Sequence, residues 1–178
     1  MKPERSKQPR PPLDSAALER LALFYAGRYA TTRAKLRSYL ARKANERGWA
    51  DDGEPPIERI VERFAELGYV DDRSFATAKG ASLQRKGYGE RRLDQALYAA
   101  GIDPADAAEA REQAQAGAFQ AALRFAERKR IGPYAAAEPD RQARARAFAA
   151  MIRAGHSPDL TRKIIDSRAG ELPIPDEN

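Results

Sequence analysis

The stretch Gly68-Tyr69-Val70-Asp71-Asp72-Arg73-Ser74-Phe75-Ala76 decides the fold, because it has the pattern of one helix ending and another beginning. Gly68 follows apolar residues with helical spacing, and glycine is common directly after the last turn of a helix. Asp71 can cap the next helix, since its carboxylate accepts hydrogen bonds from the free N–H groups of a first turn. Helices over residues 57–67 and 72–86 are therefore predicted. The second is expected to bury Phe75, Ala78 and Leu83.

The next stretch, Leu83-Gln84-Arg85-Lys86-Gly87-Tyr88-Gly89-Glu90-Arg91-Arg92-Leu93, predicts a sharp turn and a third helix. Gly87 and Gly89 permit the chain to reverse. Leu93 and Leu97 are four residues apart, which places them on one face of a helix over residues 90–100. The polar faces around this turn carry a set of cations: Lys79, Arg85, Lys86, Arg91 and Arg92.

Together, these two stretches resemble the signature of the RecX family, bacterial regulators of the RecA recombinase. A weaker resemblance extends over about residues 16–166. It implies an all-α fold of tandem three-helix repeats. It also implies docking in the groove of the RecA nucleoprotein filament, across neighbouring RecA subunits. ATP hydrolysis, strand exchange and filament growth would be modulated, mainly inhibited, and DNA repair and recombination regulated in this way.

The composition favours helices that pack through thin seams. Of 178 residues, 42% are hydrophobic but only 8% are aromatic, and there is no cysteine, which excludes disulfides and thiolate metal sites. The net charge of +6 favours a polyanionic partner or an acidic protein surface. No stretch has the apolar length of a membrane span, and the N-terminus has no apolar secretory core. We therefore expect a cytoplasmic protein that does not contact the membrane.

A single helical-repeat domain is predicted over residues 14–168. Residues 1–13, rich in proline, lysine and arginine, are interpreted as a disordered basic tail, and residues 169–178 as a frayed C-terminal tail. No stretch alternates apolar and polar residues in the manner of a strand, so no sheet is predicted.

Within this domain a helix-turn-helix pair recurs at about residues 14–46, 71–100 and 140–167. An arginine closes the first helix of each pair: Arg28, Arg85 and Arg153. Connector helices are predicted at about 57–67 and 105–130, the latter continuous or divided at Gly117, and none follows the last pair. Since such a unit buries its seam only by stacking on its neighbours, the predicted fold class is all-α, an elongated array of tandem three-helix, helix-turn-helix-like repeats.

The sequence offers no constellation for catalysis. Gly87-Tyr88-Gly89 lacks the strand–helix context of a dinucleotide site, and no phosphate-binding P-loop occurs. His156 is the single histidine, which excludes a metal site built on a histidine pair, and we expect it to be satisfied or exposed in a turn. Asp71 and Asp72 precede an apolar helix and are expected to cap it. We predict a non-enzymatic protein with no catalytic, cofactor-binding or metal-binding residues.

The candidate binding residues are basic. Every charged residue from Arg20 to Lys43 is positive. The recurring arginines that close the first helix of each pair would line one side of a stacked array. The predicted RecA- or DNA-binding face comprises Arg28, Arg33, Lys35, Arg37, Lys79, Arg85, Lys86, Arg91, Arg92 and Arg153. The simpler alternative is a solvated face with no partner. Likewise, Tyr69, Phe75 and Tyr88 either pack in helix seams or stack on bases.

The predicted partner is the RecA nucleoprotein filament, with single- or double-stranded DNA as a further partner, and the protein is expected to be a monomer. One alternative is a sequence-independent DNA-binding protein that uses the same face. Another is a helical-repeat scaffold for a different protein. Inhibition of a RecA filament at concentrations where binding to free DNA is negligible would separate these hypotheses.

Overall fold

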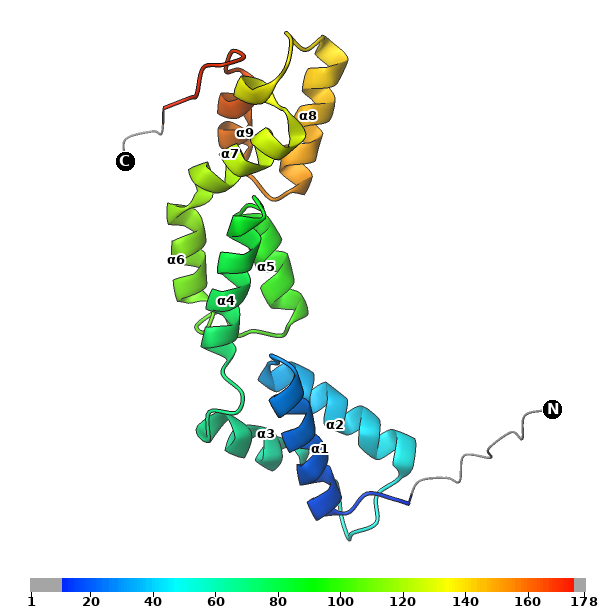
Figure 1. Cartoon of the computed structure of the whole chain (residues 1–178). Coiled ribbons are helices and arrows are strands. Elements are labelled where there is room, and N and C mark those ends of the chain that lie inside the picture. The colour runs from blue at the N-terminus through cyan, green and yellow to red at the C-terminus, as the bar shows by residue number, and fades with distance from the viewer. Residues whose placement is uncertain (1–10, 175–178) are drawn as a thin grey trace, which may run out of the picture. The chain divides into compact units, whose positions relative to one another are not determined.

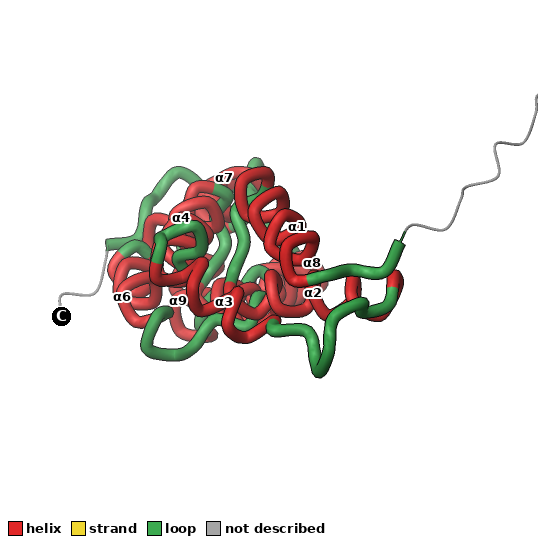
Figure 2. Tube along the Cα trace, turned by 90° about the horizontal axis from the view of Figure 1, so that it is seen from below, coloured by secondary structure: helices red, strands yellow, loops and turns green. Residues whose placement is uncertain are grey.

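The computed structural model describes residues 11–174, which form helices joined by loops (Figure 1). Figure 2 shows no strand in this part of the chain, where Leu13 and Trp49 form an isolated bridge. The all-α prediction is therefore confirmed. In chain order the helices are α1 (Ser15–Arg28), α2 (Arg33–Arg47), α3 (Ile57–Glu66), α4 (Asp72–Arg85), α5 (Glu90–Ala99), α6 (Ala108–Ala116), α7 (Ala118–Lys129), the short 3₁₀ helix η1 (Gly132–Tyr134), α8 (Arg141–Arg153) and α9 (Pro158–Ile165).

Several helices begin where a short polar side chain supplies a cap. Asp14 accepts a hydrogen bond from the N–H of Ala17, and Thr32 accepts one from Lys35. Asp140 and Ser157 cap α8 and α9 in the same way. Each cap satisfies an N–H group that has no partner within its own helix, which is why these helices start where they do.

The contacts divide the chain into two compact units, the first ending at Asp71 and the second beginning at Asp72. The sequence predicted a single domain over residues 14–168. The division has a physical basis in the hydrophobic cores. The first core ends with Val70, the next begins with Ala76, and the two share no buried residue.

The first unit is a group of three helices around one core. Helices α1, α2 and α3 enclose a cluster that includes Leu18, Leu36, Leu40 and Ile60. Leu13 is fully buried in the same cluster, and its N–H donates to the carbonyl of Gly48 at 2.9 Å. The predicted disordered tail is therefore wrong at Leu13, because an apolar side chain and a backbone bridge tie it to the unit. Pro11 and Pro12 are exposed, and residues 1–10 of that prediction lie outside the described residues.

The second unit contains two further cores, each built by three helices. Helices α4, α5 and α6 enclose one cluster, and α7, α8 and α9 enclose the other. The predicted connector at 105–130 divides at Gly117, so that its two halves, α6 and α7, serve different cores. A Cβ at Gly117 would overlap the side-chain amide of Gln84, whose nitrogen donates to the Gln113 carbonyl at 2.7 Å. Helices α7, α8 and α9 thus form a third helix group. The pair predicted at about residues 140–167 corresponds to α8 and α9, and the third helix of the group, α7, precedes this pair.

The predicted buried face of α4 is partly wrong. Phe75 and Leu83 do pack against the second core, but Ala78 is exposed, and the buried positions are Asp72, Ala76 and Gly80. The reason is that α4 packs against both α5 and α6, and a Cβ at Gly80 would contact Leu93 of α5 and Ala110 of α6. The predicted burial on α5 is confirmed, with 1% of each of Leu93 and Leu97 exposed.

Candidate binding surface

The turn between α4 and α5 is held against the third helix group by close backbone contacts. The backbone of Gly87 has φ +75°, and a Cβ there would lie 2.8 Å from the backbone nitrogen of Phe125 in α7. A Cβ at Gly89 would overlap the carbonyl group of Gly155. Gly89 N–H donates to the Ala154 carbonyl at 2.9 Å, and Arg91 N–H donates to the Gly155 carbonyl at 3.2 Å. The turn that carries the predicted cations is therefore fixed by its neighbours.

His156 lies beneath this turn, where its side chain is 2% exposed. Its Nε2 lies 3.1 Å from the Gly87 carbonyl, and since a carbonyl only accepts, Nε2 must carry the proton. We expected His156 to be either hydrogen-bonded or exposed. The ring is buried, and only Nε2 has a hydrogen-bond partner, because Nδ1 has none in the described chain. Burial lowers the pKa of His156, although the hydrogen bond to Gly87 partly opposes this effect. At neutral pH a neutral imidazole therefore supports the turn.

The predicted cations around the turn point to solvent. Lys79, Arg85, Lys86 and Arg91 are exposed, and no carboxylate among residues 11–174 forms an ion pair with any of them. Arg92 donates to the side-chain oxygen of Gln95 at 3.3 Å rather than to an acid. The structure thus brings four predicted residues, Arg85, Lys86, Arg91 and Arg92, to the two ends of one fixed turn.

Two further cations join this turn from α7, and the sequence reasoning missed them. Arg128 donates to the Lys86 carbonyl at 2.5 Å, and Arg124 donates to the Gln84 carbonyl at 3.4 Å. The guanidinium groups of Arg128 and Arg92 lie 5.7 and 5.9 Å from the centre of the Tyr88 ring. The spacing of four residues between Arg124 and Arg128 puts both on one helix face, and this signal is visible in the sequence.

The aromatic residues considered for base stacking mostly pack within the fold. Tyr88 and Phe75 are partly buried against the hydrophobic cores of the second unit. Tyr69 is 54% exposed, but its ring lies 5.4 Å from that of Phe64. These positions favour the packing alternative.

Arg153 ends α8 and is exposed. The next residue, Ala154, accepts the hydrogen bond from Gly89, so the end of α8 meets the beginning of α5. Two of the three recurring arginines, Arg85 and Arg153, therefore belong to helix ends that pack around the same junction. The third, Arg28, ends α1 in the first unit, where it donates to the Tyr29 hydroxyl at 3.3 Å.

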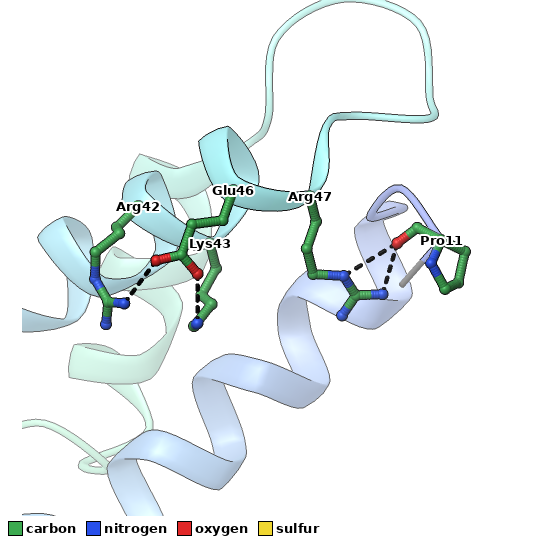
Figure 3. A network of polar contacts seen from close by, with 5 residues as sticks. All are labelled: Pro11, Arg42, Lys43, Glu46 and Arg47. Carbon is green, nitrogen blue, oxygen red and sulfur yellow. Dashed lines mark hydrogen bonds and ion pairs between the residues drawn. The ribbon is translucent and has the colours of Figure 1, made fainter. Parts of the chain in front are cut away.

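The basic run of the first unit is partly neutralised by acids from outside that run. Arg37 on α2 donates to both carboxylate oxygens of Glu58 on α3, at 2.5 and 2.7 Å, and this contact lowers the pKa of Glu58. Hydrogen bonds from Lys43 and Arg42 lower the pKa of Glu46 (Figure 3). A run without acids in the sequence is thus not a surface without acids. The other predicted cations of α2 are Arg33, which is half-buried, and Lys35, which is exposed.

Comparisons with known proteins agree with this architecture. Residues 71–110, which hold α4, α5 and the start of α6, match the family model described as RecX, second three-helix domain. The regulatory protein RecX of Myxococcus xanthus (strain DK1622) is 33% identical over 160 residues, which cover 84% of each chain. The chain belongs to the RecX family. A regulatory protein RecX of Mycobacterium sp. (strain KMS) is 36% identical over 86 residues, or 48% of this chain and 45% of the relative.

Two solved RecX structures share the fold. The crystal structure of RecX from Lactobacillus salivarius has a TM-score of 0.66 and 19% identity, and the match covers 84% of this chain and 93% of that one. A second crystal structure of a regulatory protein RecX has a TM-score of 0.62 and 18% identity over 86% of this chain and 74% of that one. The three groups of three helices seen here agree with the three-helix repeats that the family resemblance implied.

The described residues provide neither a candidate metal site nor a candidate membrane span. They contain no group of three or more histidine and acidic side chains positioned to hold a metal ion. None of their helices combines the length and the apolar character that a membrane crossing requires. The cations around the α4–α5 turn remain the strongest candidate for function.

Proposed function

We propose that this RecX protein regulates a RecA recombinase by binding the RecA–DNA filament through the cations around the α4–α5 turn. The observation that carries the proposal is a set of exposed cations that have no acidic partner among residues 11–174, Arg85, Lys86 and Arg91 among them, on a turn fixed by backbone contacts. The relatives are named regulatory proteins, which fits a protein that acts on a partner's reaction. Binding in the filament groove would mainly inhibit ATP hydrolysis, strand exchange and filament growth.

The physical case rests on charge and on rigidity. Exposed arginines form paired hydrogen bonds with phosphates and carboxylates, and both groups are present on a protein filament wrapped around DNA. A turn that is already fixed loses little conformational entropy when it binds. A positive surface also accelerates the encounter with a negatively charged partner.

The cations of the first unit provide a second contact in this proposal. Arg28, Arg33, Lys35 and Arg37 lie on α1 and α2, in a unit with its own core. Two linked binding units raise each other's effective concentration at the filament, so weak contacts by each unit add up to firm binding. The same arrangement would let one molecule span neighbouring recombinase subunits.

Charge reversal tests the proposal. The variant with Arg85, Lys86, Arg91 and Arg92 all changed to glutamate should keep the wild-type helix content and melting temperature, because exposed charges contribute little to folding. It should lose most of its effect on RecA-driven ATP hydrolysis and strand exchange. The matched control reverses four exposed arginines elsewhere, Arg20, Arg59, Arg141 and Arg168, and changes the net charge equally. The control should retain most of the inhibition.

Unchanged inhibition by the first variant would remove the α4–α5 turn from the binding face. The cations Arg28, Arg33, Lys35 and Arg37 would then become the leading candidate. Equal loss in both variants would show that net charge, rather than this turn, drives binding.

Direct binding to DNA is the second candidate function, favoured by the net charge of +6. If the four cations each contacted one phosphate, their reversal would reduce the slope of log affinity against log salt by about 3 to 4. Inhibition of the filament at concentrations where free DNA is unbound would favour the recombinase. Inhibition that follows DNA occupancy instead would favour the DNA-binding function.

A further inference from the structure

The third helix group (α7, α8 and α9 in Figure 1) contains a cavity of about 350 Å³. It lies between one side of α8, the end of α7 and the loop after η1, and we call it the α8 cavity. This volume is at the lower end of the roughly 300–1,000 Å³ that ligand pockets occupy. None of the residues that line the cavity belongs to the α4–α5 turn, so binding at the two places can be tested separately.

Helix α8 contributes a stripe of small apolar side chains to this cavity. The stripe consists of three half-buried residues, Ala143, Ala147 and Ala150. Within α8, which is described in full, Met151 alone is buried. Ile131 and Ile165 complete the apolar lining and are 8% and 7% exposed. The helix thus presents an apolar stripe that the rest of the described chain leaves partly uncovered, and such surfaces are often binding sites.

The edge of the α8 cavity is positively charged. Among the described residues no acid lines it, whereas four cations do: Lys129, Arg130, Arg144 and Arg146. Arg144 pairs with Asp166, but within residues 11–174 no carboxylate forms an ion pair with the other three, which are exposed. Arg130 has φ 54°, a left-handed conformation that glycine usually takes after a helix. Positive charge from the end of α7 and from α8 therefore surrounds an apolar floor.

The lining distinguishes between classes of ligand. The residues that line the cavity, all within the described chain, include no aromatic ring on which a base could stack, so a nucleic acid would contact only the edge. A peptide with aliphatic and acidic side chains would contact both parts, because its aliphatic groups leave water and its carboxylates pair with arginines. The net charge of +6 disfavours a second copy of this chain as the occupant.

We propose that the α8 cavity binds an acidic peptide segment of a partner protein. A leucine or isoleucine of that segment lies against Ala147 and Ile131, and flanking acids lie beside Arg130 and Arg146. The apolar floor supplies affinity, and the cations at the edge fix the orientation of the segment. A partner that also bound the α4–α5 turn would be held at two places on one unit, and linked contacts strengthen each other.

Peptide binding to the full chain tests this site. The probe is a fluorescein-labelled peptide, Asp-Glu-Leu-Asp-Glu-Ile-Asp-Glu, whose fluorescence anisotropy reports binding. One matched peptide has serine in place of leucine and isoleucine, and the other has asparagine and glutamine in place of the acids. Each replacement should weaken binding by about tenfold or more, because the site uses both the aliphatic anchor and the carboxylates.

Variants of the chain locate the bound peptide. Ala147→Phe fills the cavity and should weaken binding by at least about fivefold, whereas Ala145→Phe, at an exposed position of α8 outside the lining, should change it by less than about twofold. Arg130→Glu with Arg146→Glu should weaken it by about tenfold or more, because two attractive charges become repulsive.

The charge-matched control is Arg59→Glu with Arg141→Glu, at exposed positions outside the lining. At moderate salt, which screens distant charges, it should weaken binding by less than about threefold. Circular dichroism establishes that each variant is folded, and the arginine variants decide the outcome if Ala147→Phe is not.

Equal losses in the cavity variants and their controls would overturn the proposal, since the peptide would then bind through net charge. Full affinity of the serine peptide would overturn it as well, because the aliphatic anchor would have no role. A labelled oligothymidine that binds in place of the peptide, and is lost in the variant with Arg130→Glu and Arg146→Glu, would assign the basic edge to nucleic acid instead. Self-association of the wild type that Ala147→Phe abolishes would assign the cavity to a second copy.

Discussion

The contact between Gly89 and Gly155 predicts that one added methyl group will strongly destabilise the second unit. Gly89 has φ −86° and ψ 176°, a conformation that alanine adopts easily, so Gly89→Ala introduces no backbone strain. Its Cβ would nevertheless overlap the Gly155 carbonyl and lie 2.7 Å from the His156 nitrogen. The helix junction must therefore separate to accommodate it.

Separation removes two hydrogen bonds, from Gly89 N–H to Ala154 and from Arg91 N–H to Gly155. At about 1 kcal/mol each, these contribute about 2 kcal/mol. Overpacking of a closely fitted site costs roughly 1–3 kcal/mol more. We therefore expect Gly89→Ala to lower the free energy of unfolding of the second unit by about 3–5 kcal/mol. Urea titration followed by circular dichroism would show this as a lower midpoint for that unit.

Gly80→Ala is the matched control, since Gly80 is also a buried glycine of the second unit. A Cβ there would meet Leu93 at 3.5 Å and the Ala110 Cβ at 3.8 Å, which are ordinary contacts. Because alanine favours a helix interior over glycine, this variant should gain roughly 0.5–1 kcal/mol. If Gly89→Ala loses less than about 1 kcal/mol while Gly80→Ala behaves as expected, the junction between the start of α5 and the turn after α8 does not pack in solution as described.

Three other substitutions test the same unit by urea titration. Leu97→Ala should cost about 2–5 kcal/mol because the side chain is fully packed, whereas Tyr98→Ala, at an 89% exposed position, should change stability by less than about 0.5 kcal/mol; similar losses in the two variants would contradict the helix phase. His156→Gln keeps an N–H donor for Gly87 but does not titrate. Burial lowers the folded-state pKa of His156, so below about pH 6.5 the unfolded chain binds more protons than the folded chain. The stability that neutral His156 contributes is therefore fully present above about pH 6.5. It is lost as the pH falls through the folded-state pKa. The wild type should lose more stability than His156→Gln between about pH 7 and pH 5, and parallel losses would show that His156 does not titrate in this way.

The local elements could be predicted because short-range chemistry determines them. Gly68, Asp71 and the spacing of Leu93 and Leu97 were sufficient to place α3, α4 and α5 to within a residue or so. The grouping of helices was harder, because α6 and α7 form an almost uninterrupted run of good helix formers. The sequence marks Gly117 as the weakest position of this run, but whether the run divides there depends on packing, since α6 and α7 contribute to different cores.

The candidate surface shows a similar limit. The exposure of Arg85, Lys86 and Arg91 could be predicted, since these residues flank a turn between two amphipathic helices. The neutralisation of Arg37 by Glu58 could not, because the two residues are 21 positions apart and meet only when α2 packs on α3. The placement of Arg128 beside Lys86 likewise requires the contact between α7 and α4, across 42 positions.

The buried junction beneath the α4–α5 turn links the stability of the third helix group to the proposed binding surface. His156 and Ala154, which follow α8, hold Gly87 and Gly89, and Arg128 of α7 holds Lys86. A substitution in α7, α8 or α9 can therefore displace the cations of the turn without contacting the partner. Loss of regulation by such a variant does not place its residue in an interface. The four-residue charge reversal avoids this ambiguity, because the four side chains are exposed and the contacts that hold the turn to its neighbours from Gly89 and Arg91 are made by backbone atoms.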